Sequence, residues 1–283
     1  MKKKNFFLYC YNIDIDGTLL TPEGKLSERT KNVINKILEK NKDLHFVLAS
    51  GRAMPATQQI RNTLNIIKRP NTESILSNGC VIYDSESNII YQNTIPTEFF
   101  VKAHKVLKPS SEYTYMYSIG NDAFTYNEYW AKTIKEKYEE QTVVIDKDEF
   151  TKKIEMGEIK VNKFSILVKS SEEAENIEEK LDKLRKEYKL EYAYSAGTFV
   201  DYMPPDTNKG TGLNHLIKIL NVKKEEVIAF GDGGNDIELL QSAGWPVAME
   251  NASNKLKSHA KLITKSNRED GVADLLEKVF LKD

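Results

Sequence analysis

The chain is poor in the residues that build disulfide frameworks and histidine metal sites. Its 283 residues include only two cysteines, Cys10 and Cys80, and their spacing is neither metal-like nor redox-like. We therefore expect no disulfide framework, and the composition fits a reducing, cytoplasmic compartment. The four histidines form no close pair, which disfavours a histidine-based metal site.

The chain also lacks an excess of either charge and any long apolar run. There are 41 basic and 42 acidic residues, so nothing indicates a nucleic-acid partner. No stretch approaches the ~20 apolar residues that span a bilayer, so no membrane partner is expected. The lysines at 2–4 and the apolar run at 6–10 superficially resemble a signal peptide. That run is short and soon meets Asp14, so we interpret it as a first buried strand.

In place of long apolar runs, the sequence has short ones, and several of these end in a polar cluster. Continuous apolar strands of this kind suit a sheet that is buried on both faces. The runs are 6–15, 44–49, 74–76, 227–230, 246–249 and 262–263.

Helical patterns lie between these runs. Ser27 is placed to cap a helix, and the pattern Leu213, Leu216, Ile217, Leu220 predicts another that ends near Asn221. Alternating strands and helices predict an α/β fold, an open parallel sheet with helices on both faces. Ligands bind beyond the carboxyl ends of the strands in such sheets, where the polar clusters fall.

The middle of the chain is patterned differently. Residues 113–117 and 123–126 alternate like strands, 163–168 form another short strand, and 172–190 read as an amphipathic helix. We therefore predict an inserted α+β domain over 84–191. The rest, 1–83 and 192–283, is predicted to form the core domain, to which the chain returns through Phe199–Met203.

The polar clusters bring together residues suited to phosphate chemistry. Asp14 and Asp16, in an extended strand, would share one face, which alone fits either a solvated strand end or a metal-binding pair. With Asp232 and Asp236 they make four carboxylates, which would repel a phosphate unless a cation intervenes. Mg²⁺ suits such oxygen ligands. Ser50 and Lys209 can supply donors and positive charge to phosphoryl oxygens.

These motifs resemble those of the haloacid dehalogenase superfamily, and the whole chain resembles its Cof-like phosphatases with a type IIB cap. The first motif matches Asp14-Ile15-Asp16-Gly17-Thr18, and the second matches Ser50-Gly51-Arg52. The third matches Lys209 within Asn208-Lys209-Gly210. The fourth matches Gly231-Asp232-Gly233-Gly234-Asn235-Asp236. The resemblance implies a Rossmann-like core with 84–191 as the cap that selects the substrate.

The resemblance also implies a role for each matched residue. Asp14 would be the nucleophile and a Mg²⁺ ligand, and Asp16 the general acid/base whose backbone carbonyl also binds Mg²⁺. Asp232 would bind the metal directly, and Asp236 would hold metal-bound water or orient Lys209. The implied phosphate-binding residues are Ser50, Gly51, Lys209 and Asn235, and the implied substrate-binding residues are Arg52, Asn78 and Asn251. Glu250 stands where the family often has glycine, which puts the role of Asn251 in doubt.

The predicted function is hydrolysis of small phosphomonoesters, such as sugar phosphates or related metabolites, through an aspartyl-phosphate. Two other hypotheses stay open from the residues. A phosphosugar mutase would return the phosphoryl group to another hydroxyl of the substrate. A phospho-accepting switch would use an aspartate, magnesium and a lysine without turnover, but such proteins lack an acid/base at the position of Asp16. The protein itself is predicted to be a monomer or a small homo-oligomer.

Overall fold

The computed structural model describes residues 10–107, 113–138, 140–195 and 197–281. Residues 6–9 of the expected first strand, and most of the segment compared with a signal peptide, lie outside these ranges. The chain divides into two compact units. Unit 1 comprises the chain up to Gly51, Gln59–Tyr91 and the chain from Asn208 onward, and unit 2 comprises Arg52–Gln58 and Gln92–Thr207. Among the helices within the described ranges, none has the length and apolar character needed to cross a membrane.

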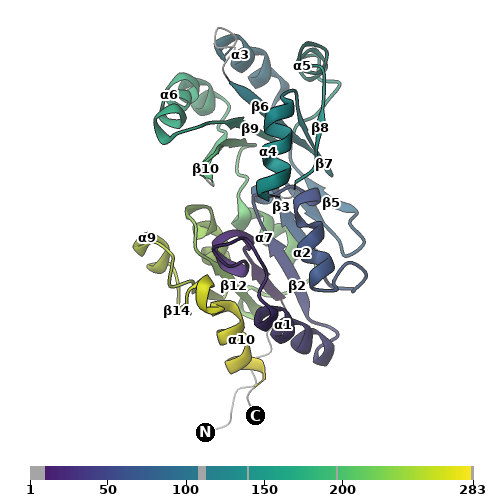
Figure 1. The fold of residues 1–283 in the computed structure, drawn as a ribbon, viewed down its shortest axis with the longest axis vertical. Coiled ribbons are helices and arrows are strands. Elements are labelled where there is room, and N and C mark those ends of the chain that lie inside the picture. Colours follow the sequence, from purple (N-terminus) through teal and green to yellow (C-terminus); the bar gives the residue numbers. More distant parts are fainter. Residues whose placement is uncertain (1–9, 108–112, 139, 196, 282–283) are drawn as a thin grey trace. The chain divides into compact units, whose positions relative to one another are not determined.

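Unit 1 is built on an eight-stranded sheet in the order β14-β13-β12-β1-β2-β3-β4-β5. Strands β2, β3, β5, β12 and β14 of this sheet are labelled in Figure 1. The pairs from β14 to β3 are parallel, as predicted, whereas β4 runs antiparallel to β3 and makes the sheet mixed. The strands are β1 Cys10–Ile13, β2 His45–Ala49, β3 Ser74–Leu76, β4 Val81–Tyr83, β5 Ile89–Gln92, β12 Val227–Gly231, β13 Trp245–Ala248 and β14 Leu262–Ile263.

Helices cover both faces of this sheet, because successive strand residues point to opposite faces and both are apolar. In β1, Tyr11 and Ile13 pack with α1 and α10, while Cys10 packs with α7 and α8. The helices are α1 Glu28–Lys40, α2 Gln58–Thr63, α7 Lys209–Ile219, α8 Ile237–Ser242, α9 Asn254–Lys257 and α10 Gly271–Phe280. The predicted two-sided burial is therefore confirmed.

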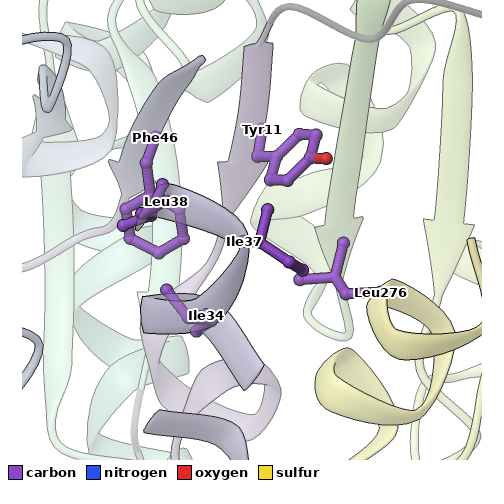
Figure 2. Close-up of a pocket in the computed structure, with 6 residues that line it drawn as sticks. All are labelled: Tyr11, Ile34, Ile37, Leu38, Phe46 and Leu276. Carbon is purple, nitrogen blue, oxygen red and sulfur yellow. The ribbon is translucent and has the colours of Figure 1, made fainter. Parts of the chain in front are cut away.

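Helix α1 illustrates how the local sequence positions an element. The Ser27 hydroxyl accepts a hydrogen bond from the Thr30 amide at 3.0 Å, so Ser27 is the predicted N-cap. Ile34, Ile37 and Leu38 then line a small apolar pocket against the sheet (Figure 2). The other lining residues are Tyr11 from β1, Phe46 from β2 and Leu276 from α10. This pocket belongs to the packing of the core, because all six lining residues are aliphatic or aromatic.

Unit 2 is built on a six-stranded sheet in the order β10-β11-β9-β6-β7-β8. Its pairs are antiparallel except that of β7 with β8. Aromatic residues such as Phe99, Tyr117 and Phe164 form the core between this sheet and its helices. The elements are β6 Thr114–Ile119, β7 Asp122–Thr125, β8 Thr142–Val144, β9 Lys163–Leu167, β10 Glu191–Ser195, β11 Phe199–Met203, α3 Thr97–Leu107, α4 Glu128–Tyr138, α5 Lys147–Glu155 and α6 Ser171–Glu187.

The segment Phe199–Met203 corrects one expectation from the sequence. It forms β11, which pairs with β10 and β9 in the sheet of unit 2, so the chain does not return through it to unit 1. The reason is physical: five buried residues in a row fit either sheet, and the choice depends on distant partner strands. The boundaries of unit 2 accordingly differ from the predicted 84–191.

Candidate active site

Three neighbouring strands of unit 1 end at the same edge of the sheet. Ile13 at the end of β1 pairs with Phe230 of β12 on one side and with Leu48 of β2 on the other. Asp14 follows β1, while Ser50 follows β2 and Asp232 follows β12. The parallel register therefore brings the first, second and fourth motifs to one place, as the sequence predicted.

The first motif turns sharply after Asp14. Strand β1 ends at Ile13, and Ile15–Leu19 form a wide turn in which the Leu19 amide donates to the Asp14 carbonyl at 3.2 Å. Gly17 has φ +80°, in the left-handed region that favours glycine. Asp14 is buried and Asp16 is exposed. Contrary to the expectation from the sequence, the two carboxylates therefore do not share one face of an extended strand.

Lys209 enters the site from α7. Asn208 caps that helix with a hydrogen bond of 2.9 Å from the Thr211 amide, so Lys209 is its first residue. The Lys209 Nζ lies 2.5 Å from Asp14 Oδ1 and 2.6 Å from Asp236 Oδ1. All three side chains are buried. The buried ammonium therefore links the first, third and fourth motifs.

The second oxygen of Asp236 is fixed by its own loop. Asp236 Oδ2 accepts hydrogen bonds from the amides of Asp232 and Gly233 at 3.0 and 2.9 Å. Since Oδ1 already contacts Lys209, both oxygens of Asp236 have protein partners. This geometry favours a positioning role for Asp236 over direct metal binding.

Thr18 and Asn251 hold Asp232 against the first motif. The Thr18 hydroxyl donates to Asp232 Oδ1 at 2.7 Å, and a Cβ on Gly17 would come within 2.2 Å of Asp232 Oδ2. Asn251 Nδ2 donates to the Gly17 carbonyl at 2.9 Å. Sequence reasoning assigned no role to Thr18, although it lies within the motif; its position two residues after an aspartate was the available signal.

Burial and charge change the proton affinities of the cluster. Burial raises the pKa of Asp14 well above its ordinary range, and Asp236 adds to the rise while Lys209 opposes it. Burial likewise raises the pKa of Asp232 to about 6, against the lowering effect of the Thr18 hydrogen bond. Burial lowers the pKa of Lys209, but attraction to Asp14 and Asp236 outweighs it and the pKa is raised overall.

The same cluster is consistent with a cation site. Asp14, Asp232 and Asp236 each offer a carboxylate oxygen within 4.8 Å of the others. Three ionised carboxylates beside one ammonium would leave two uncompensated negative charges, which matches a divalent cation. Carboxylate oxygens are ligands for hard cations such as Mg²⁺ and Ca²⁺.

The remaining predicted residues are divided between the units. Ser50, Asn78, Asn235 and Asn251 lie in unit 1, and the Asn235 Nδ2 donates to Asn78 Oδ1 at 3.0 Å. Arg52 is grouped with unit 2, where its guanidinium donates to the Ala56 carbonyl at 3.0 Å and so braces its own turn.

Glu250 does not prevent Asn251 from reaching the first and fourth motifs. The side chain of Asn251 lies 3.4 Å from Asp232 Oδ2, in addition to its contact with Gly17, and its Oδ1 accepts from the Asn267 amide at 3.0 Å. Asn251 therefore lies within reach of both motifs, and its role in binding substrate stays a prediction.

Comparison with known proteins agrees with this arrangement. The profile of the haloacid dehalogenase-like hydrolase family matches residues 11–276. The 5-amino-6-(5-phospho-D-ribitylamino)uracil phosphatase of Bacillus subtilis is 28% identical over 261 residues, covering 92% of this chain and 91% of the relative. A haloacid dehalogenase-like hydrolase of Bacteroides thetaiotaomicron has a similar structure, with a TM-score of 0.82, 26% identity and coverage of 96% of this chain and 99% of that one.

A sugar phosphatase of subclass IIB shares the fold, with a TM-score of 0.74, 22% identity and coverage of 95% of this chain and 98% of its own. The family match spans nearly the whole described chain, and the buried contacts of Lys209 join three of its motifs. The resemblance in the sequence and the predicted class of enzyme are both confirmed. The chain belongs to the haloacid dehalogenase-like hydrolase family, as a member of the phosphatase type.

Proposed function

We propose that the protein is a Mg²⁺-dependent phosphatase that hydrolyses small phosphomonoesters through an aspartyl-phosphate on Asp14. The observation that carries this proposal is the bridge from Lys209 to Asp14 and Asp236, with Asp232 beside it. A buried carboxylate next to a fixed ammonium is suited to attack a phosphorus atom whose oxygens carry negative charge.

The proposed reaction has two steps. In the first, Asp14 attacks the phosphorus, the ester P–O bond breaks, and Asp16 gives a proton to the leaving oxygen. In the second, Asp16 takes a proton from water, which attacks the phosphorus and releases phosphate from Asp14. The exposure of Asp16 supports this role, since an exposed carboxyl can exchange its proton with solvent.

Other residues would hold the phosphoryl group during both steps. We assign this to the Ser50 hydroxyl, the Gly51 amide, the Lys209 ammonium and the Asn235 amide. Mg²⁺ would be held by Asp14, the Asp16 carbonyl and Asp232, with Asp236 acting through water, and when bound it would supply positive charge to the phosphoryl oxygens.

We further propose that the substrate is a sugar phosphate or a related phosphorylated metabolite, and that unit 2 is the domain that selects it. The support is the pair of relatives described above, one acting on a phosphoribityl compound and one named a sugar phosphatase. Both names indicate small polyhydroxylated phosphomonoesters.

The test is Asp14→Asn in the full chain with Mg²⁺ and p-nitrophenyl phosphate. We expect turnover to fall by about a thousandfold or more, because the amide cannot serve as the nucleophile. Asp274→Asn is the matched control, since Asp274 is also an aspartate of unit 1 but pairs with Lys278 on α10. Full activity of the Asp14 variant would contradict the mechanism. With a sugar phosphate as the substrate of the wild type, substrate loss without stoichiometric free phosphate would point to a mutase.

A further inference from the structure

The turn between β3 and β4 has a strained backbone, and the proposed mechanism assigns no role to its residues. Three consecutive residues, Ser77, Asn78 and Gly79, have positive φ angles of 51°, 58° and 96°. Only glycine adopts this region without steric cost, so two of the three residues are strained. Such strain persists where the surrounding structure fixes the backbone, often at functional sites.

The contacts of this turn explain what fixes it. The Asn78 amide donates to the Ser50 carbonyl at 3.0 Å. A Cβ on Gly79 would lie 2.2 Å from the Asn208 carbonyl oxygen, so the turn packs directly against the start of α7. It therefore touches the backbone that precedes Lys209 and the backbone of Ser50, all within unit 1.

The side chain of Asn78 reaches the remaining phosphate-binding segments. Its Oδ1 accepts from Asn235 Nδ2 at 3.0 Å, and a Cβ on Gly51 would lie 3.1 Å from Oδ1 and 3.4 Å from Nδ2. Asn78 is only 2% exposed. Its Nδ2 has no hydrogen-bond partner among the described residues. A buried donor of this kind is costly unless a ligand or water accepts from it.

We propose that Asn78 Nδ2 donates a hydrogen bond to an oxygen of the bound phosphoryl group. This inference rests on the proposed function, because Ser50, Gly51, Lys209 and Asn235 are the residues assigned there to the phosphoryl group. Since Oδ1 accepts from Asn235, Nδ2 is the atom left without a partner in an amide group that lies beside Gly51. An anionic oxygen is the strongest acceptor for such a donor.

Inorganic phosphate, the reaction product, is the probe for the test. Its Kd is measured by isothermal titration calorimetry on the full chain with Mg²⁺, and its inhibition constant is measured with p-nitrophenyl phosphate. Asn78→Gly removes the donor and tolerates the left-handed backbone, and we expect it to weaken phosphate binding about tenfold or more. Asn78→Asp replaces the donor by a negative charge and should weaken binding further.

Asn221→Gly and Asn221→Asp are the matched controls, because Asn221 has φ 54° but is exposed after α7. We expect both to leave phosphate binding unchanged. The unfolding midpoint of each variant shows whether it folds, and Asn78→Gly keeps the test valid if the charged variant does not.

A double variant separates direct contact from an effect through Asn235. If Asn78 contacts phosphate, Asn78→Gly will weaken binding in an Asn235→Ala background as well. Loss of the effect in that background, or an unchanged phosphate Kd in a folded Asn78→Gly protein that still turns over substrate, would overturn this inference alone. A wild-type protein that neither turns over aryl phosphate nor binds phosphate would overturn the proposed function with it.

Discussion

At the scale of single residues, the site depends on side chains that hold the carboxylates in place. Lys209 fixes Asp14 and Asp236 from the helix side, and Thr18 fixes Asp232 from the first motif. Partners of metal-binding residues are often as important as the ligands, because they orient the oxygens that bind. Under the proposed mechanism, the site therefore depends on more residues than the four carboxylates.

Thr18→Val tests this dependence on a supporting residue. The change removes the hydrogen bond to Asp232 Oδ1 and keeps the shape of the side chain, so we expect the Mg²⁺ concentration for half-maximal activity to rise about tenfold. A magnesium titration of aryl phosphate hydrolysis measures it. Thr63→Val is the control, since that hydroxyl donates to the Gln59 carbonyl of its own helix. An unchanged magnesium requirement would contradict the claim that Thr18 positions Asp232 for Mg²⁺ binding.

Residue patterns predicted which motifs of the candidate site lie together, but they did not predict two features of its geometry. Polar clusters after buried runs correctly located Asp14, Ser50 and Asp232, because parallel strands end at one edge. Their sequence spacing could not show that Asp14 is buried and Asp16 exposed, since the turn at Gly17 separates them. It also could not show that both oxygens of Asp236 have protein partners, because that depends on atoms of distant segments.

At the scale of elements, close packing of backbone against backbone joins the turn 77–79 to α7. Gly79 lies against Asn208, and Gly212 in the first turns of α7 lies against Gly79 in return. A side chain at Gly79 would push directly on the residue that caps α7 and precedes Lys209. The position of Lys209 is therefore controlled from β3 and β4 as well as from its own helix.

Gly79→Ala and Gly24→Ala form a matched pair for this contact. Gly24 has φ +73° and nothing within 4 Å of a new Cβ, so its variant should lose only about 1–2 kcal/mol through backbone strain. Gly79 has φ +96° and meets the Asn208 carbonyl at 2.2 Å, so we expect a further loss of about 1–3 kcal/mol. Urea unfolding measures both, and equal losses would contradict the contact.

The core of unit 2 contains a histidine whose protonation should affect stability. His104 contacts Glu155 at 2.9 Å and the Tyr117 hydroxyl at 3.1 Å. Burial lowers the pKa of His104 below its ordinary value of 6.5, although Glu155 opposes this. The unfolded chain then binds the proton more tightly than the folded one. The contribution of neutral His104 to the free energy of unfolding is therefore complete above about pH 6.5. It is lost as the pH falls through the pKa of His104 in the folded protein.

Urea unfolding at pH 7.5 and 5.5 tests whether the free energy of unfolding falls on acidification. We expect the wild type to lose stability at the lower pH, and His104→Gln to lose less, because it has no proton to gain. His215→Gln is the control, since His215 is exposed in unit 1. A larger loss of stability in the His104 variant than in the wild type on acidification would contradict the assignment.

Individual helices and strands were easier to predict from the sequence than the unit to which each one belongs. The Ser27 cap and the helix of 172–190 follow from local periodicity, and both are present as α1 and α6. Strand β11 was assigned to the wrong sheet because pairing with β9 and β10 depends on residues far away in the sequence. The left-handed turn at Ser77 and Asn78 gave no signal, since serine and asparagine also occur in ordinary turns.

At the scale of the whole molecule, the two units should respond differently to magnesium. Asp14, Asp232 and Asp236 all belong to unit 1, so a cation bound there stabilises that unit. Binding only to the folded state adds about 2.7 kcal/mol at a ligand concentration a hundredfold above Kd.

Hydrogen–deuterium exchange with and without Mg²⁺ measures this response. We expect added protection around residues 14–20 and 231–236, and little change in the helices of unit 2. Asp14→Asn should reduce the protection. Equal protection across both units, or none in unit 1, would contradict the assignment of the cation to this cluster.

The bridge between Asp14 and Lys209 has a consequence for how the protein acquires activity. The two residues are 195 positions apart, and most of the chain between them belongs to unit 2. Closing a loop of that length is entropically unfavourable, and contacts so distant in sequence form slowly. During refolding, recovery of catalysis should therefore lag behind recovery of helix content, so that turnover reports the completion of folding.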